Sequence, residues 1–203
     1  MREVQADVTR VFPGTWRWRT AFMLPDRYAW TIQTATEPDH YLFDGAVVRA
    51  FIGTRLVAVD SAPHAPLRGQ ARLEAVVGLD ALELPGVRVA PLPASELPPG
   101  TRAGLVVVFA DDGASYRVAF DRRDRLVWAT GPASLPPLGE GAIVARFGDF
   151  RRAGGVRLPF RISYALNGEP LAEARVVAVC PNDPRLGAAS FQAPELVPDC
   201  PRH

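Results

Sequence analysis

The stretch from Ala142 to Cys180 constrains the fold of this chain most. From Val156 to Leu166, apolar side chains occupy every second position, and mostly polar side chains lie between them. Strict alternation over about ten residues is typical of a strand buried on one side only. Asn167-Gly168 then supplies the positive φ angles that a tight hairpin turn needs. The stretch predicts an antiparallel meander with one apolar face and one solvated face.

Short runs of alternating apolar and polar residues, separated by turn residues, make up most of the chain before this stretch. Strands are expected at about 3–9, 16–22, 28–34, 41–43, 47–52, 56–59, 105–109, 116–120, 126–130 and 142–149. The Pro-rich segment 87–100 is expected to be an irregular surface loop.

One segment breaks the strand pattern. From Pro66 to Leu84 the apolar residues recur at helical spacing, and Pro85-Gly86 follows as a stop signal. Gly78 weakens the pattern and can divide it into two shorter pieces. A helix this apolar must be covered, most cheaply by the open side of a sheet.

Length and charge exclude several classes of protein. A chain of 203 residues is most simply one domain, 1–203, with a core or cavity of its own. A net charge of +1 argues against an electrostatically driven nucleic-acid binder, although all 23 basic residues are Arg. The chain has no apolar run of about 18 residues, so no membrane span is expected. Met1 leads directly into a strand pattern, which fits a cytoplasmic protein or one whose export signal lies outside this sequence.

The sequence offers no catalytic constellation. The three histidines (His40, His64 and His203) lie in turns, loops or the tail, and no metal, nucleophile or phosphate-loop motif accompanies them. Acidic pairs such as Asp111-Asp112 fall where hairpin turns are expected, which is the usual place for Asp. We therefore expect a protein that is not an enzyme and that holds no cofactor and no metal.

The two cysteines leave three alternatives open. A Cys180–Cys200 disulfide would pin the tail to the sheet and would imply an oxidising compartment. Cys200 with His203 could instead form half of a metal site, although further ligands at suitable spacing are missing. Two unpaired thiols are the third alternative.

Aromatic residues gather on the first hairpin. Three of the four tryptophans, Trp16, Trp18 and Trp30, fall on one side of it by alternation. Such a face either fills a core or lines an apolar ligand pocket, because Trp is bulky and seldom fully enclosed.

The C-terminal half resembles a known family. The residues that carry the likeness are 147–151 (Phe-Gly-Asp-Phe-Arg), Gly155–Ile162, Asn167-Gly168, Glu173, Val179, Asn182 and the closing Phe191-x-x-Pro194. Their pattern is similar to that of the outer-membrane lipoprotein carrier superfamily, the LolA/LolB-like and LppX-like proteins. The Leu24-Pro25-Asp26-Arg27 turn resembles the first hairpin of that family. The likeness is good over about 142–194, fair over 14–60 and poor between.

The resemblance implies a mainly β (α+β) fold. Its expected form is a strongly curved antiparallel sheet, an unclosed β-barrel, with a helical lid at about 66–84 over the concave apolar face and an irregular tail at about 181–203. It implies a non-catalytic periplasmic or outer-membrane-associated carrier of lipid or acylated lipoprotein, with other envelope transport proteins as possible partners and peripheral membrane contact. The family has no single catalytic pattern, so no functional residue is carried over from it.

Alternation and the resemblance together predict the cavity wall. The side chains expected to line it are Trp16, Trp18, Phe22, Tyr28, Trp30, Ile32, Leu73, Val76, Val77, Phe109, Phe120, Phe147 and Phe160. A one-residue bulge would invert the facing of any strand among them. The rival hypothesis is a structural or protein-interaction module of the envelope, with a solidly packed core and no ligand cavity. Cavity volume separates the two, since a carrier needs several hundred Å³.

Overall fold

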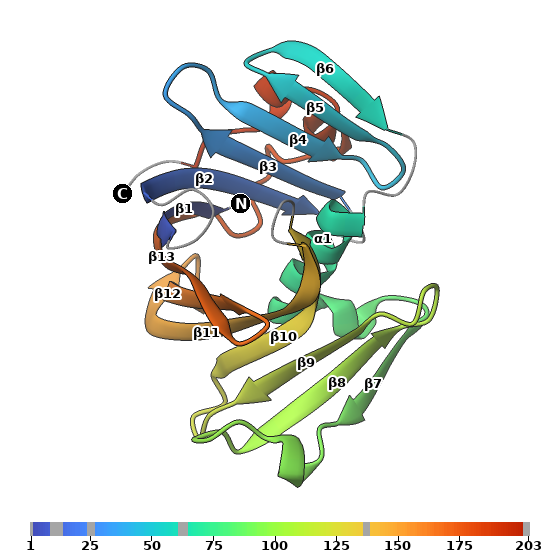
Figure 1. Cartoon of the computed structure of the whole chain (residues 1–203), viewed down its shortest axis with the longest axis vertical. Helices are drawn as coiled ribbons and strands as arrows, with labels where there is room; N and C mark the ends of the chain where they lie inside the picture. The colour runs from blue at the N-terminus through green and yellow to red at the C-terminus, as the bar shows by residue number, and fades with distance from the viewer. Residues whose placement is uncertain (1, 9–13, 24–26, 61–64, 136–138, 201–203) are drawn as a thin grey trace.

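The described residues form one antiparallel sheet of thirteen strands (Figure 1). The computed structural model describes residues 2–8, 14–23, 27–60, 65–135 and 139–200, and only the backbone at 3–8, 60, 65–68, 134, 135 and 139. Strand order is β6-β5-β4-β3-β2-β1-β13-β12-β11-β10-β9-β8-β7. The strands are β1 (Arg2–Val8), β2 (Gly14–Met23), β3 (Arg27–Gln33), β4 (Asp39–Phe43), β5 (Val48–Ile52), β6 (Arg55–Asp60), β7 (Val87–Pro91), β8 (Ala103–Phe109), β9 (Ser115–Phe120), β10 (Leu126–Leu135), β11 (Gly139–Ala153), β12 (Val156–Leu166) and β13 (Glu169–Val179).

The sheet curves around the helix α1 (Ala65–Val77), and its edge strands β6 and β7 lie at opposite ends of the molecule (Figure 1). The sheet is therefore an unclosed barrel with a helix on its concave face, which confirms the expected fold class. The α-helix ends one residue before Gly78, and a short 3-10 helix, η1 (Asp80–Glu83), follows. Gly78 thus divides the predicted helix into two pieces.

The meander predicted from alternation is present as β11, β12 and β13. Asn167 and Gly168 have φ angles of 52° and 85°, as the turn between β12 and β13 requires. The Asn167 side chain also accepts a hydrogen bond of 3.0 Å from the backbone N–H of Ala142, which ties the turn to β11. Along β12, Ile162 and Leu166 are buried on the apolar face.

The expectation of an irregular loop over 87–100 is wrong at its start. Val87–Pro91 forms edge strand β7 and pairs with β8, and only the short 3-10 helix η2 (Ala94–Glu96) interrupts the rest. Proline suits this place because an edge strand has no neighbour on one side to receive its N–H. The predicted turn at Leu24-Pro25-Asp26 lies outside the described residues.

Both faces of the sheet are covered, but by different parts of the chain. Helix α1 covers the concave face. The C-terminal tail, with the 3-10 helices η3 (Ala188–Phe191) and η4 (Pro194–Leu196), covers part of the convex face. Phe191 and Val197 of the tail are buried there against Ala21, Leu42 and Phe51. The tail therefore completes a second core on the outer side of β2–β5.

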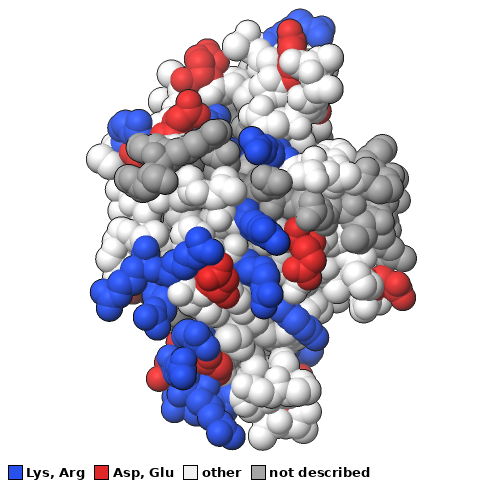
Figure 2. All heavy atoms as spheres, turned by 90° about the vertical axis from the view of Figure 1, so that its left-hand side faces the viewer, with Lys and Arg blue, Asp and Glu red and all other residues white. Residues whose placement is uncertain are grey.

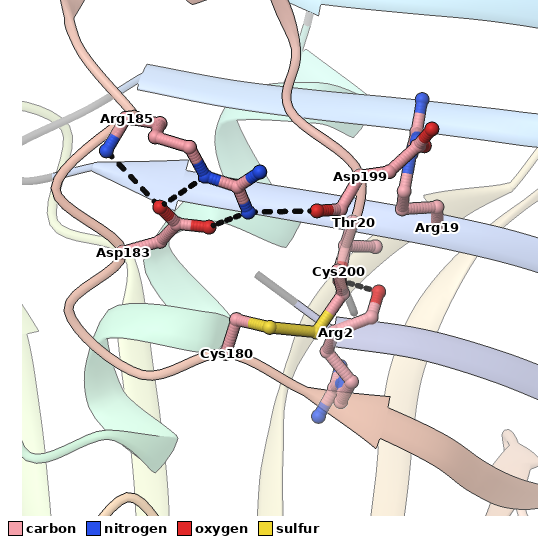
Figure 3. The surroundings of a disulfide bond; sticks show 8 residues. All are labelled: Arg2, Arg19, Thr20, Cys180, Asp183, Arg185, Asp199 and Cys200. Carbon is pink, nitrogen blue, oxygen red and sulfur yellow. Dashed lines mark hydrogen bonds and ion pairs between the residues drawn. A yellow bond between two sulfur atoms is a disulfide. The ribbon is translucent and has the colours of Figure 1, made fainter. Parts of the chain in front are cut away.

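A disulfide fixes this tail to the end of β13. Cys180 and Cys200 are bonded, with Cα atoms 5.8 Å apart (Figure 3). Beside the bond, Arg185 donates to the Asp183 carboxylate at 2.7 Å and to the carbonyl oxygen of Asp199 at 2.8 Å. Arg19 on β2 forms an ion pair with Asp199. Of the three alternatives for the cysteines, the structure contains the disulfide.

Breaking the disulfide should loosen the tail. For a closed loop of 20 residues, the double variant Cys180→Ser/Cys200→Ser is expected to lose about 3 kcal/mol of unfolding free energy. Urea denaturation of both proteins measures the difference, and adding a thiol reductant should lower the wild-type value toward that of the variant. Equal stabilities with and without the bond would show that the tail is held by its packing alone.

Candidate functional site

Helix α1 packs across the concave face and joins the two halves of the sheet. On one side Leu73 and Val76 belong to an apolar cluster with residues of β8–β13. On the other side Ala71 belongs to a cluster with Tyr28, Phe43 and others of β3–β5. We call these the large and the small concave cluster. Small residues allow the close approach, since a side chain on Gly131 would collide with the ring of Tyr116 under the helix.

The structure brings most of the predicted wall residues together under or beside this helix. In the large cluster Leu73, Val76, Phe109 and Phe147 are buried, and Trp18, Phe22, Val77, Phe120 and Phe160 pack against them. Tyr28 is buried in the small cluster, and Trp30 and Phe22 pack against it. Trp30 also contacts Tyr41, with ring centroids 5.9 Å apart.

Trp16 and Ile32 lie in neither concave cluster, although strand register gives them the same face. Ile32 pairs with Trp18 across β2 and β3, and Trp16 is two residues further along β2. Both side chains are half-buried. They extend the apolar face beyond the area that α1 covers.

A buried ion pair lies between the helix and the sheet. Arg2 on β1 binds Glu74 on α1, and Gln70, one turn earlier, donates to the same carboxylate at 3.4 Å. Burial by itself would lower the pKa of Arg2, but the charge of Glu74 and the nearby hydroxyls of Tyr164 and Tyr28 raise it above its ordinary value. Burial also raises the pKa of Tyr164 to about 12. The guanidinium is therefore held in its charged form beneath the helix.

One donor of this arginine is unsatisfied. The Nε of Arg2 is buried and has no hydrogen-bond partner among the described residues. Buried donors without partners are uncommon in folded proteins and cost stability. The group is therefore available to an acceptor oxygen that reaches the concave face.

A second ionic contact holds the opposite side of α1. Arg72, 8 % exposed, bonds to Asp111 at 2.6 Å and also to Asp112, both in the turn between β8 and β9. Its guanidinium lies 4.5 Å from the centre of the Phe109 ring, which favours a cation. The two aspartates were expected as turn residues, and tertiary packing gives them this further role.

The space left under the helix is very small. A cavity of about 10 Å³ is lined by Arg2, Gln70, Leu73, Glu74, Val77, Ala145, Phe147 and Tyr164. Such a volume holds at most one water molecule, whereas small-molecule pockets occupy about 300–1,000 Å³. With α1 in this position, this cavity between the helix and the sheet has no room for an acyl chain.

Five of the eight residues around this cavity were not predicted. Tyr164 and Ala145 lie on strands whose apolar face is evident from alternation, so the same pattern could have predicted them as lining residues. Arg2, Gln70 and Glu74 carry no local signal, because a charged residue at a strand start or on a helix is normally solvated.

Neither metal ligands nor membrane spans are found in the described part of the chain. No three His, Cys, Asp or Glu side chains there are grouped so as to hold a metal ion. No described helix has the length and apolar character needed to cross a membrane.

Removing the carboxylate of the buried ion pair should destabilise the fold. Glu74→Gln leaves the Arg2 charge without its partner, and we expect a loss of about 2–3 kcal/mol in unfolding free energy because the pair is mostly shielded from water. Denaturant unfolding measures it, with Glu83→Gln on the exposed side of η1 as the charge-matched control. Equal effects of the two substitutions would contradict a structural role for the pair.

Comparison with known proteins shows a likeness in fold. No family model matches the chain, and no curated protein matches it. Among solved structures, the crystal structure of a LolA superfamily protein from Nitrosomonas europaea superposes with a TM-score of 0.61, covering 93% of this chain and 86% of that one at 12% sequence identity. At this identity the likeness shows the architecture: the chain has a LolA-like fold.

Proposed function

We propose that this protein is a non-catalytic carrier of the bacterial cell envelope that binds acyl chains of lipid or lipoprotein on its concave face. The whole chain acts as one carrier domain, located in the periplasm or at the outer membrane. Helix α1 is the lid, and the structure described here is the closed state. The predicted wall residues line the ligand site once the lid moves.

The ion pairs on either side of α1 carry this proposal. A permanent core helix is most cheaply held by apolar packing, because buried charges lose their hydration on folding. Here Glu74 and Arg72 bind opposite halves of the sheet through charged groups. When the helix moves away, these groups regain water, so opening costs less than it would for an all-apolar interface of the same size.

The chemistry of the concave face suits an acyl ligand with a polar end. Each methylene moved from water onto this face contributes about 0.8 kcal/mol, which offsets the loss of contacts between α1 and the sheet. The unpaired Nε of Arg2 could then donate to an ester or carboxylate oxygen of the ligand. The ligand would replace the helix in contacts with both concave clusters.

The cavity of only 10 Å³ favours a second candidate. In that alternative the helix never leaves, the concave face is a solid core, and the protein is an interaction module of the envelope. Ligand uptake separates the two functions, because a solid core takes up no acyl chain.

Native mass spectrometry of protein exported to a bacterial periplasm, followed by organic extraction, tests the carrier function. We expect an adduct of lipid mass that is lost on delipidation and regained when lipid is added. A single apo mass that never changes in the presence of acyl ligands would favour the packed module.

Tryptophan substitutions locate the ligand. Trp18→Ala and Trp30→Ala should each weaken binding of a fluorescent fatty acid about tenfold, because each ring supplies apolar wall area. Trp128→Ala is the matched control: Trp128 pairs with exposed Arg146 on the convex face and should leave affinity unchanged. If all three variants bind alike, the acyl chain does not lie on the concave face.

The lid is tested by the rate of uptake. Glu74→Gln removes one of the two ionic contacts of α1 and should speed association of the same probe several-fold, although it lowers stability, since a larger fraction of molecules is open. The Glu83→Gln control should bind at the wild-type rate. Unchanged or slower association in Glu74→Gln would exclude α1 as the gate.

A further inference from the structure

Arginines gather on the convex face, away from the lid. Figure 2 looks onto the side of the molecule where β11, β12 and β13 lie and shows basic side chains over its middle and lower parts. Register explains part of this group, since Arg161 on β12 lies directly opposite Arg175 on β13. Arg175 pairs with Gln5 of β1, which in turn pairs with Arg17 of β2. Adjacent strands are about 4.8 Å apart, so Arg161 and Arg175 are direct neighbours, and Arg17 lies on the same line one strand beyond Gln5.

A hollow adjoins these arginines. It measures about 400 Å³ and is lined by Arg146, Phe147, Gly148, Arg161, Ser163 and Glu173. Gly148 shapes its floor, because a Cβ at that position would lie 3.3 Å from a terminal nitrogen of Arg161. The missing side chain lets the guanidinium lie over the strand. The polar groups that line the hollow are thus the guanidinium groups of Arg146 and Arg161, the hydroxyl of Ser163 and the single carboxylate of Glu173.

This arrangement costs stability in the isolated protein. Like charges directly opposite each other on neighbouring strands repel, and Arg161 and Arg175 are both exposed and opposite. Within the described residues, none of Arg146, Arg161 and Arg175 forms an ion pair. Other exposed arginines, such as Arg151 and Arg185, bind a neighbouring aspartate. Asp149 lies near Arg161: its pKa is lowered by its hydrogen bond with Arg151 and, more weakly, by the charge of Arg161. Arg161 and Arg175 still lie opposite each other without an ion pair among the described residues, which suits them to an external anion.

We propose that this face, defined by Arg17, Arg146, Arg161 and Arg175, docks on an anionic phospholipid bilayer, with a headgroup phosphate in the hollow between Arg146 and Arg161. Guanidinium groups bind phosphate through paired N–H donors. A broad group of exposed arginines matches a membrane surface, where each contributes through the surface potential. A small free anion would instead need buried donors, and the net charge of +1 does not suit nucleic acid. The docking surface lies on the face of the sheet opposite the proposed ligand site, although Phe147 of β11 belongs to the large concave cluster and also lines the hollow.

Vesicle co-sedimentation tests this proposal. At low salt the protein should pellet with vesicles of equal parts phosphatidylglycerol and phosphatidylcholine, stay in solution with phosphatidylcholine alone, and be released by high salt. Arg146→Gln and Arg161→Gln should each weaken partitioning about fivefold. Arg88→Gln removes the same charge from an exposed position on edge strand β7 and should have no such effect.

Two results would overturn the proposal. One is equal partitioning of wild-type protein to both kinds of vesicle; the other is equal weakening by Arg88→Gln and by the two hollow variants, which would mean that only total charge matters. Both vesicles are made with the same acyl chains, so uptake of lipid into the carrier site cannot produce a headgroup difference. Thermal unfolding of each variant verifies that the fold is intact. A failed vesicle test therefore leaves the proposed carrier function standing. A failed test of acyl-chain uptake likewise leaves the membrane-docking proposal standing.

Discussion

The packing of α1 against the concave face is the interaction on which the rest of the structure depends. An open, strongly curved sheet exposes the inner faces of both its halves, and only an element that touches both can cover them. Helix α1 does so with Ala71 in the small concave cluster and with Leu73 and Val76 in the large one. The charged contacts of Glu74 and Arg72 then fix the helix at either side. The same contacts make its position reversible in the function proposed here.

The convex face is divided between a covered and an open part. Over β2–β5 the tail buries Phe191 and Val197, and the disulfide keeps the tail in place. Over β11–β13 the structure describes no such cover, and arginines lie exposed in register. If only the concave face needed a cover, the tail would have no packing role. Here the tail completes a second core and leaves the basic surface accessible.

Much of the fold followed from local pattern. The alternation along β12, the turn at Asn167-Gly168 and the helical spacing between Pro66 and Leu84 are all present in the structure. Each is a short-range property, set by side-chain period or by backbone sterics. Edge strand β7 was missed because its Pro-rich sequence favours a loop, and pairing with β8 overrides that preference.

The sequence by itself determined which residues are apolar on each strand, where the chain turns, and that one helix must be covered. Only the tertiary structure decided that Arg2 meets Glu74 across 72 positions, that little space remains under the helix, and that Arg161 and Arg175 lie on one line with Arg17. The physical reason is the distance along the chain over which each interaction acts. Period and turn chemistry act within a few residues, whereas register and the place of a lid follow from how the whole sheet curves, which no single segment encodes.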